Sequence, residues 1–231
     1  MIGIGIHDSS SSLAPYFASS NGKFLLISTG TWCINMNPFN TEKLTAEQLD
    51  RDCLCYMSIT KQPVKSSRLF LGHLHEVAVN KLNNHFKTRS DYYKKVKPDN
   101  TLLEICRKKC RESRFFFENQ PYSRELKGKN DLFVFKSYEE AYHQLMVELS
   151  ELTVEAIELV MTADNDNENI YITGGFSNNQ LFLKLISEAY PMYNVYTSEV
   201  SNATALGAAL VILSSLNAEK KPVLSLGLNR C

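Results

Sequence analysis

The chain lacks an excess of either charge, and this limits the partners that it could bind through its overall field. Among its 231 residues, Lys and Arg together number 25, and so do Asp and Glu. Proteins that hold nucleic acid or an anionic membrane electrostatically carry a basic surplus. We therefore expect no nucleic-acid partner and no membrane partner.

Long hydrophobic runs are scarce as well. No apolar stretch approaches the ~20 residues of a membrane span, and the N-terminus shows no basic region followed by an apolar one. The composition, 44% hydrophobic and 22% charged, is that of ordinary globular domains. These features predict a cytoplasmic protein with one large core or two small ones.

The six cysteines do not have the spacing of a zinc knuckle. Cys53 and Cys55 form a C-x-C, whereas Cys106 and Cys110 form a C-x-x-x-C inside a helical pattern. Structural zinc sites favour C-x-x-C pairs with turn glycines, which both pairs lack. We expect reduced structural thiols and no metal site in this chain.

Two glycine motifs of common enzyme classes are also missing. No G-x-S-x-G occurs, which argues against a serine hydrolase. Gly3 and Gly5 form a G-x-G, but no third glycine follows, so the pattern gives little support to a dinucleotide-binding loop.

The first forty residues concentrate the features that suggest chemistry. The apolar runs Ile2–Ile6 and Phe24–Ser28 are typical of strands, and the first leads directly to Asp8. Asp8 falls at the N-cap of a helix expected over Ser9–Ala14, which Pro15 should limit because proline lacks the helical N–H. A carboxylate at this place is either a simple cap or a catalytic base.

A short turn follows the second of these strands. Phe24–Ser28 leads into Thr29, Gly30 and Thr31, and Trp32–Met36 then returns as an antiparallel strand. Gly30 would supply a positive φ, and its missing Cβ would let a phosphate approach the backbone N–H groups, with threonine hydroxyls as further donors. Any hairpin could use the same residues, so the motif alone does not specify a function.

The second half of the chain alternates helices and strands. The hydrophobic pattern predicts helices over Ser137–Met161, Asn178–Tyr190 and Ala203–Leu216, and strands over Ile170–Thr173 and Asn194–Thr197. Short links between them favour a right-handed parallel arrangement. Gly174 and Gly175 end a strand and face a helix for which Ser177 and Gln180 form a capping box. Such sheets bind nucleotides at this place.

The pattern loosens between Thr41 and Lys136. This segment, about 41–136, is interpreted as an insertion packed on the main core, with no chemistry that we can assign. Its histidines His73, His75 and His85 fall on an amphipathic helical pattern, which favours structural roles over metal or ligand binding.

The order of these motifs resembles the C-terminal half of the FGGY carbohydrate kinases, members of the actin-like ATPase superfamily. The resemblance rests on His7-Asp8 before small residues, S-T-G-T-W at 28–32, T-G-G-F-S-N-N at 173–179 and A-T-A-L-G-A-A-L at 203–210. It implies an α/β, ribonuclease H-like mixed sheet flanked by helices. The His-Asp and S-x-G-T-W motifs are most similar to those of rhamnulokinases and L-fuculokinases.

This resemblance also implies an activity and a set of roles. The activity is ATP-dependent phosphorylation of a sugar hydroxyl, with a ketose such as L-rhamnulose or L-fuculose as substrate. The implied catalytic base is Asp8, the implied ATP phosphate-binding residues are Thr29, Gly30 and Thr31, and the implied adenosine-binding residues are Gly174, Gly175 and Asn178. ATP and Mg²⁺ are the implied cofactors, with most metal ligands in the other lobe.

The chain departs from the family in one respect. Members are about twice as long, a two-domain size, and their N-terminal half supplies a D-x-G-T loop, whereas no D-x-G occurs here. We therefore expect residues 1–231 to form the nucleotide-binding lobe of a two-lobed kinase, inactive alone and with an exposed face that favours a homodimer. Two alternatives stay open: a non-catalytic nucleotide-binding module, in which Asp8 is only a cap, and a structural domain whose glycines merely turn the chain.

Overall fold

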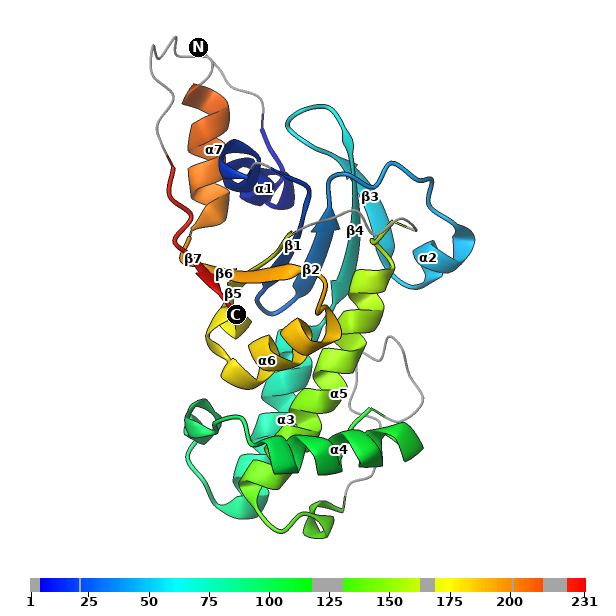
Figure 1. The fold of residues 1–231 in the computed structure, drawn as a ribbon, viewed down its shortest axis with the longest axis vertical. Helices are drawn as coiled ribbons and strands as arrows, with labels where there is room; N and C mark the ends of the chain where they lie inside the picture. The colour runs from blue at the N-terminus through cyan, green and yellow to red at the C-terminus, as the bar shows by residue number, and fades with distance from the viewer. Residues whose placement is uncertain (1–4, 21, 118–130, 163–168, 201, 214–223) are drawn as a thin grey trace.

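The computed structural model describes residues 5–20, 22–117, 131–162, 169–200, 202–213 and 224–231. Within these residues, seven strands form one sheet in the order β3-β4-β2-β1-β5-β6-β7 (Figure 1). The strands are β1 Phe24–Thr29, β2 Cys33–Asn37, β3 Cys53–Met57, β4 Pro63–Leu69, β5 Asn169–Gly174, β6 Asn194–Ser198 and β7 Leu228–Arg230. The α-helices are α1 Asp8–Ser19, α2 Ala46–Asp50, α3 Leu71–Phe86, α4 Asn100–Glu112, α5 Tyr138–Glu158, α6 Gln180–Ala189 and α7 Ala203–Leu213. Three 3₁₀ turns complete the set, namely η1 Tyr92–Lys95, η2 Leu132–Val134 and η3 Gly175–Asn178.

The sheet is mixed, as the sequence predicts. β1 pairs with β2, β2 with β4 and β4 with β3, all antiparallel. β1, β5 and β6 run parallel, and β7 closes the other edge antiparallel to β6. Four of the predicted strands therefore lie where they were expected, within one or two residues at their ends.

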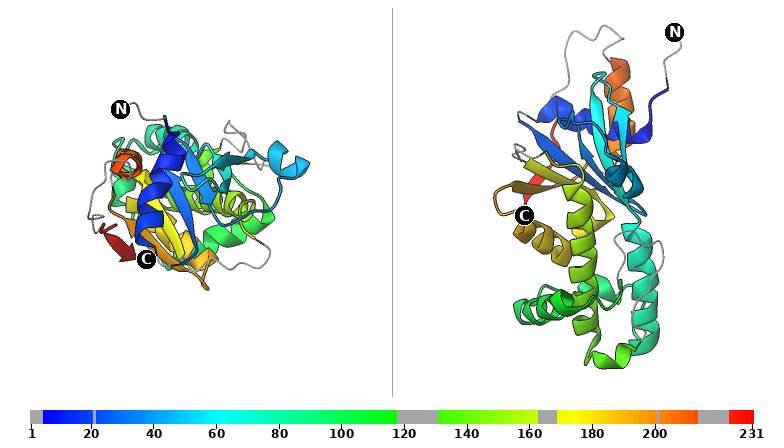
Figure 2. Two further views of the ribbon diagram at one scale, coloured as in Figure 1. Left: turned by 90° about the horizontal axis from the view of Figure 1, so that it is seen from above. Right: turned by 90° about the vertical axis from the view of Figure 1, so that its right-hand side faces the viewer.

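Successive side chains of the central strand β1 point to opposite faces of the sheet, and the core is therefore divided into two clusters. Leu25 and Ile27 of β1 point into the larger cluster, which α3, α5 and α6 cover. Phe24 and Leu26 point to the opposite face and pack in the smaller cluster with Tyr16 of α1. This period of two is what an extended strand imposes on its side chains. The sheet therefore carries helices on both faces, α1 and α7 on one side and α3, α5 and α6 on the other (Figure 2).

The expected strand Ile2–Ile6 lies mostly outside the described residues. Residues 2–4 lie outside the described part of the chain, and Gly5 and Ile6 belong to neither a helix nor a strand. The helix α1 begins two residues later, at Asp8. In the described part of the chain, the residues after Ile6 therefore form the helix α1, which packs on one face of the sheet.

Pro15 does not end α1, so that prediction is wrong. The helix continues to Ser19 with Pro15 inside it. Proline removes the donor for the carbonyl four residues earlier, on Ser11. That carbonyl faces α7 at Gly207, where a Cβ would come within 1.7 Å of the oxygen. Ser11 also donates its hydroxyl to the Thr204 carbonyl at 2.6 Å, so packing against α7 outweighs the local penalty.

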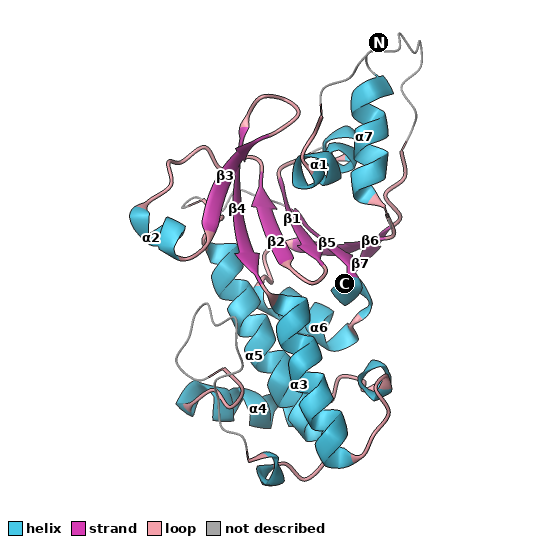
Figure 3. Ribbon diagram, turned by 180° about the vertical axis from the view of Figure 1, so that it is seen from behind, coloured by secondary structure: helices cyan, strands magenta, loops and turns pink. Residues whose placement is uncertain are grey.

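The segment from 41 to 136 contributes more to the core than an appended insertion would. It supplies β3 and β4 to the sheet and α3 to one face. Figure 3 shows α3 lying beside α5, with α4 crossing near their far ends. No described helix is both long and apolar enough to cross a membrane.

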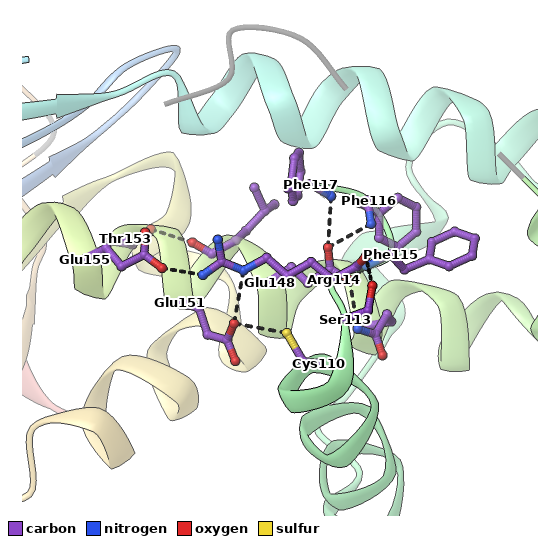
Figure 4. A network of polar contacts seen from close by, with 12 residues as sticks. Cys110, Ser113, Arg114, Phe115, Phe116, Phe117, Glu148, Glu151, Thr153 and Glu155 are labelled. Atoms are coloured by element: carbon purple, nitrogen blue, oxygen red, sulfur yellow. Dashed lines mark hydrogen bonds and ion pairs between the residues drawn. The ribbon is translucent and has the colours of Figure 1, made fainter. Parts of the chain in front are cut away.

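A buried carboxylate fastens the residues that follow α4 to α5. Glu148 is 0% exposed and accepts backbone N–H groups from Phe115, Phe116 and Phe117 at 2.8, 2.8 and 3.1 Å. Gln144 donates a fourth hydrogen bond at 2.8 Å. Burial raises the pKa of Glu148, and these four donors oppose that rise. Figure 4 shows how the segment wraps against α5 around this side chain.

Candidate functional site

Two loops meet where β1 and β5 end. The parallel register pairs Thr29 with Gly174, so the turn after β1 and the 3₁₀ turn after β5 emerge side by side. Gly30 and Gly175 are both exposed, each one residue beyond this pair. Parallel strands deliver their carboxyl ends to one edge of a sheet, and ligands of such sheets bind there.

Gly174 holds the two strands in close approach. Its φ is +88°, and a Cβ at this position would lie 1.7 Å from the Thr29 carbonyl oxygen. The Thr29 hydroxyl donates to the Thr173 carbonyl at 2.6 Å and accepts the Phe176 N–H at 3.0 Å. Thr29 is buried, and its hydroxyl is used within the fold. Among the three predicted phosphate-binding residues, Gly30 and Thr31 are the ones that face outward.

The turn itself is supported from α3. Gly30 donates its N–H to the Trp32 carbonyl at 2.8 Å, and its φ is not positive, which corrects the reason given for a glycine there. Gly72 donates its N–H to the Thr31 carbonyl at 3.1 Å. A Cβ on Gly72 would lie 2.2 Å from the Gly30 oxygen. Gly72 is therefore a supporting neighbour of the turn that was not predicted, although a glycine directly after the apolar residues Leu69, Phe70 and Leu71 was a visible signal.

A cavity of about 760 Å³ opens beside these loops, within the range of small-molecule sites. It brings together Gly30, Gly175 and Asn178 of the predicted site, whereas Thr31 and Gly174 do not line it. The full lining consists of Gly30, His75, Tyr93, Lys94, Lys95, Val96, Lys97, Gly175, Phe176, Asn178, Asn179 and Gln180.

A chain of three side chains fixes the inner wall of the cavity. The Asn179 carboxamide accepts the Phe182 N–H at 3.2 Å, so its NH₂ group faces Tyr142 and donates to the phenol oxygen at 2.8 Å. The Tyr142 hydroxyl then donates to Nε2 of His75 at 3.0 Å. Burial lowers the pKa of His75 to about 4, so its ring is neutral at pH 7. The chain joins α6, α5 and α3 behind the loops.

Asn179 also corrects a prediction about α6. It is the N-cap of that helix, whereas the sequence pointed to Ser177. The Ser177 hydroxyl instead donates to the Gly174 carbonyl at 2.7 Å. The change places an exposed 3₁₀ turn, Gly175–Asn178, between β5 and α6.

The structure does not bring Asp8 to this cavity. Asp8 is the first residue of α1 and His7 is its N-cap, so the prediction of Asp8 as N-cap is off by one residue. The Asp8 side chain is 75% exposed, and its Oδ1 lies 2.9 Å from Nδ1 of His7. Two residues later, Ser10 donates its hydroxyl to the Met57 carbonyl at 3.0 Å.

The strand register gives the distance along the sheet between the start of α1 and the Gly30 turn. Met57 lies level with Pro63, and Thr29 lies level with Cys33 and hence with Leu69. Six residues of β4 separate the two levels, about 20 Å at the rise of a strand. Figure 1 agrees, with α1 beside the upper ends of β1 and β2 and their shared turn at the lower end. Asp8 and the Gly30 turn therefore sit at opposite ends of the sheet.

The cysteine pairs do not come together. Cys53 of β3 is buried, whereas Cys55, two residues further along the same strand, is exposed. Cys106 and Cys110 are both buried along α4. Among the described residues, no group of three or more His, Cys, Asp or Glu side chains is arranged to hold a metal ion.

Comparison with known proteins gives a family and a fold. Residues 21–221 match the family described as carbohydrate kinase FGGY, C-terminal domain. A carbohydrate kinase from Novosphingobium aromaticivorans superposes with a TM-score of 0.66 at 21% identity, covering 98% of this chain and 47% of that kinase. A ligand-bound xylulose kinase from Lactobacillus acidophilus gives 0.67 at 12% identity, covering 92% and 42%.

A third solved structure has a nucleotide bound. The glycerol kinase of Plasmodium falciparum, determined with ADP, superposes with a TM-score of 0.54 at 13% identity and covers 91% of this chain and 42% of that kinase. At these identities the likeness shows the fold. The chain spans less than half the length of the solved kinases that it resembles. The comparison with curated proteins found no match.

Proposed function

This chain belongs to the FGGY carbohydrate kinase family, as its C-terminal domain, and on that premise we propose that it is the nucleotide-binding lobe of a two-lobed sugar kinase. The reaction is transfer of the γ-phosphoryl group of ATP to a hydroxyl of a small sugar. The observation that supports this proposal is the cavity at the carboxyl ends of β1 and β5, which is lined by Gly30, Gly175 and Asn178 together. Its position, size and exposed backbone are those of a nucleotide site in an α/β sheet.

In the proposed complex, adenosine lies against Gly174, Gly175 and Asn178. The space beside Gly175 is open, since no atom lies within 4 Å of a Cβ built there. The phosphates extend towards Thr29, Gly30 and Thr31, of which the last two are exposed. Because the Gly30 N–H is engaged with the Trp32 carbonyl, the proposed donor at this turn is the hydroxyl of the exposed Thr31.

The described cavity lining does not include the side chains that usually bind Mg²⁺ in proteins. Hard divalent cations prefer carboxylate oxygens, and the described cavity lining includes no Asp or Glu. We therefore propose that the metal ligands, and most sugar contacts, belong to the part of the kinase that this chain does not span. L-Rhamnulose and L-fuculose are the proposed substrates, on the strength of the His-Asp and S-T-G-T-W motifs.

We propose Asp8 as the base that takes the proton of the sugar hydroxyl. Its carboxylate is exposed at the first residue of α1. A weak base suffices when the proton leaves late in phosphoryl transfer. This role requires that α1 and the γ-phosphate approach each other in the two-lobed enzyme, because about 20 Å separates their levels along the strands.

That separation favours a second candidate, a nucleotide-binding module without phosphotransferase activity. In it, Asp8 would act only at the start of α1, where its Oδ1 accepts the Ser9 N–H at 2.6 Å. Such a module would bind ATP and ADP at the same cavity.

Calorimetric titration with ADP tests the site that both candidates share. We expect binding by the 231-residue chain, and at least about tenfold weaker binding by Gly175→Val, whose side chain fills the open space, equivalent to ~1.4 kcal/mol. Lys108→Ala, on the outer face of α4, is the control. No binding of ADP at millimolar concentration would favour a purely structural domain.

A coupled ADP-release assay separates the two candidates. The chain alone should show no sugar-dependent turnover, because catalysis needs two lobes closed around both substrates. With the remaining part of the kinase joined, turnover on L-rhamnulose or L-fuculose should approach roughly 1–100 per second and fall at least about 10²-fold in Asp8→Asn. Full turnover in Asp8→Asn would exclude Asp8 as the base.

A further inference from the structure

The cavity has a second wall, formed by the connection between α3 and α4. Tyr93, Lys94, Lys95, Val96 and Lys97 line the cavity together with Gly30 and Gly175. The sequence pattern of this region indicates no chemistry. Its lysines are not part of any motif, and only the fold brings them to the same cavity as Gly30 and Gly175.

The charge of the cavity is unlike that of the chain. The whole chain has a formal net charge of +0, whereas the cavity lining contains three lysines and neither Asp nor Glu. Among the described residues, no ion pair joins Lys94, Lys95 or Lys97 to a carboxylate. His75 adds no opposing charge, since its ring is neutral at pH 7. Lys94 Nζ lies 5.9 Å from the centroid of the Tyr93 ring, but none of the three ammonium groups has a carboxylate partner among the described residues, which favours an anionic ligand.

The wall is held in place from both ends. Tyr92 donates its hydroxyl to Glu139 of α5 at 2.6 Å, and the Tyr93 ring packs edge-on against His75, with centroids 4.9 Å apart. At the other end, Asp99 donates its N–H to Nε2 of His143 at 3.0 Å. The backbone that carries the lysines is therefore anchored to α3 and α5, while the three lysine side chains stay exposed.

We propose that Lys94, Lys95 and Lys97 bind the phosphate chain of the nucleotide and so select for di- and triphosphates over nucleosides. This inference rests on the proposed nucleotide site and adds a specificity-determining segment to it. The phosphates lie beside the exposed Gly30 turn, and the lysines neutralise their charge. Affinity should therefore rise with the number of phosphates, in the order adenosine, AMP, ADP and ATP.

The test compares a triple variant with a charge-matched control across that series of ligands. Lys94→Ala/Lys95→Ala/Lys97→Ala should bind ADP about thirtyfold more weakly, taking about threefold for each exposed ion pair. ATP binding should weaken at least as much, and adenosine binding should stay within about twofold. Lys43→Ala/Lys81→Ala/Lys108→Ala removes the same charge at exposed positions outside the cavity and should leave all four affinities unchanged.

Two further measurements strengthen the comparison. Arginine at the three cavity positions should restore most of the ADP affinity, and raising the salt concentration should shrink the difference between wild type and the alanine variant, because salt screens exposed charges. ADP should also protect Lys94, Lys95 and Lys97, but not Lys108, from acetylation in the wild-type chain. This labelling needs no folded variant.

The outcomes separate this inference from the function on which it rests. If wild type binds none of the four ligands, the nucleotide site and the lysine wall are both wrong. If wild type binds ADP, but the alanine variant matches it or the control weakens equally, the lysine inference is overturned and the nucleotide site stands.

Discussion

Gly174 and Gly175 are neighbours in sequence, yet the structure predicts opposite effects for the same substitution. Gly174 has φ +88° and ψ −158°, a region that essentially only glycine occupies. An L-residue there costs about 1–3 kcal/mol. Its Cβ would also lie 1.7 Å from the Thr29 carbonyl oxygen, so β1 and β5 would have to separate.

The separation would disturb the hydrogen bonds that Thr29 makes across the two strands. Its hydroxyl joins the Thr173 carbonyl and the Phe176 N–H, and each such bond contributes about 0.5–1.5 kcal/mol. Together with the backbone strain, we expect Gly174→Ala to lower the free energy of unfolding by about 3–5 kcal/mol. At Gly175 no atom lies within 4 Å of an added Cβ. Gly175→Ala should therefore be neutral or stabilise by up to ~1 kcal/mol through the unfolded state.

Urea unfolding followed by circular dichroism measures both variants against wild type. The reasoning predicts a gap of at least about 3 kcal/mol between the two alanine variants. If Gly174→Ala were as stable as wild type, the close approach of β1 and β5 would be refuted. If Gly175→Ala lost as much as Gly174→Ala, the open space beside Gly175 would be refuted.

Three more predictions follow from buried contacts. Glu148→Ala leaves three backbone N–H groups without their acceptor and should cost about 3 kcal/mol in urea unfolding, with a smaller loss for Glu148→Gln; an equal loss in both would contradict the hydrogen-bond explanation. Burial lowers the pKa of His75 in the folded state to about 4, below its ordinary value. The unfolded state therefore binds more protons than the folded state between pH 6.5 and pH 4. As the pH falls through this range, we expect the free energy of unfolding to decrease by up to ~3 kcal/mol. His75→Gln should lack this part of the acid sensitivity, and identical pH profiles for the two proteins would contradict the assignment. Gly72→Ala forces a Cβ towards the Gly30 oxygen and should weaken ADP binding several-fold in calorimetry, whereas unchanged binding would show that the turn does not need its support from α3.

Elements set by local periodicity could be predicted from the sequence. The apolar run Phe24–Ser28, the stripe along Ser137–Met161 and the buried run Ile170–Thr173 each signal their own structure, and all three are where they were expected. The meeting of Gly30 with Gly175 also followed, because parallel strands carry their ends to one edge.

Features decided by distant contacts could not be predicted in this way. Pro15 stays inside α1 because Gly207, far along the chain, accommodates the Ser11 carbonyl. Asn179 caps α6 by accepting the Phe182 N–H, and its amide NH₂ group donates to Tyr142 of α5, a contact between distant parts of the chain. The lysines at 94, 95 and 97 have no helical or strand periodicity, and only the packing of Tyr92 and Tyr93 on the core brings them to the cavity.

The position of Asp8 relative to the Gly30 turn also could not be predicted from the local sequence. In the sequence, a carboxylate after an apolar run suggested a base beside the Gly30 turn. In the structure, the Ser10 hydroxyl contacts the Met57 carbonyl and places the start of α1 at the opposite end of the sheet. Sequence proximity therefore suggested that Asp8 and the Gly30 turn lie together, whereas the structure separates them.

A crystal structure of the 231-residue chain with ADP tests the central claim most directly. The account predicts adenine against Gly175 and Asn178, with the diphosphate between the Gly30 turn and the lysines at 94, 95 and 97. ADP ordered at another surface, or an empty cavity at an ADP concentration that saturates binding in solution, would contradict it.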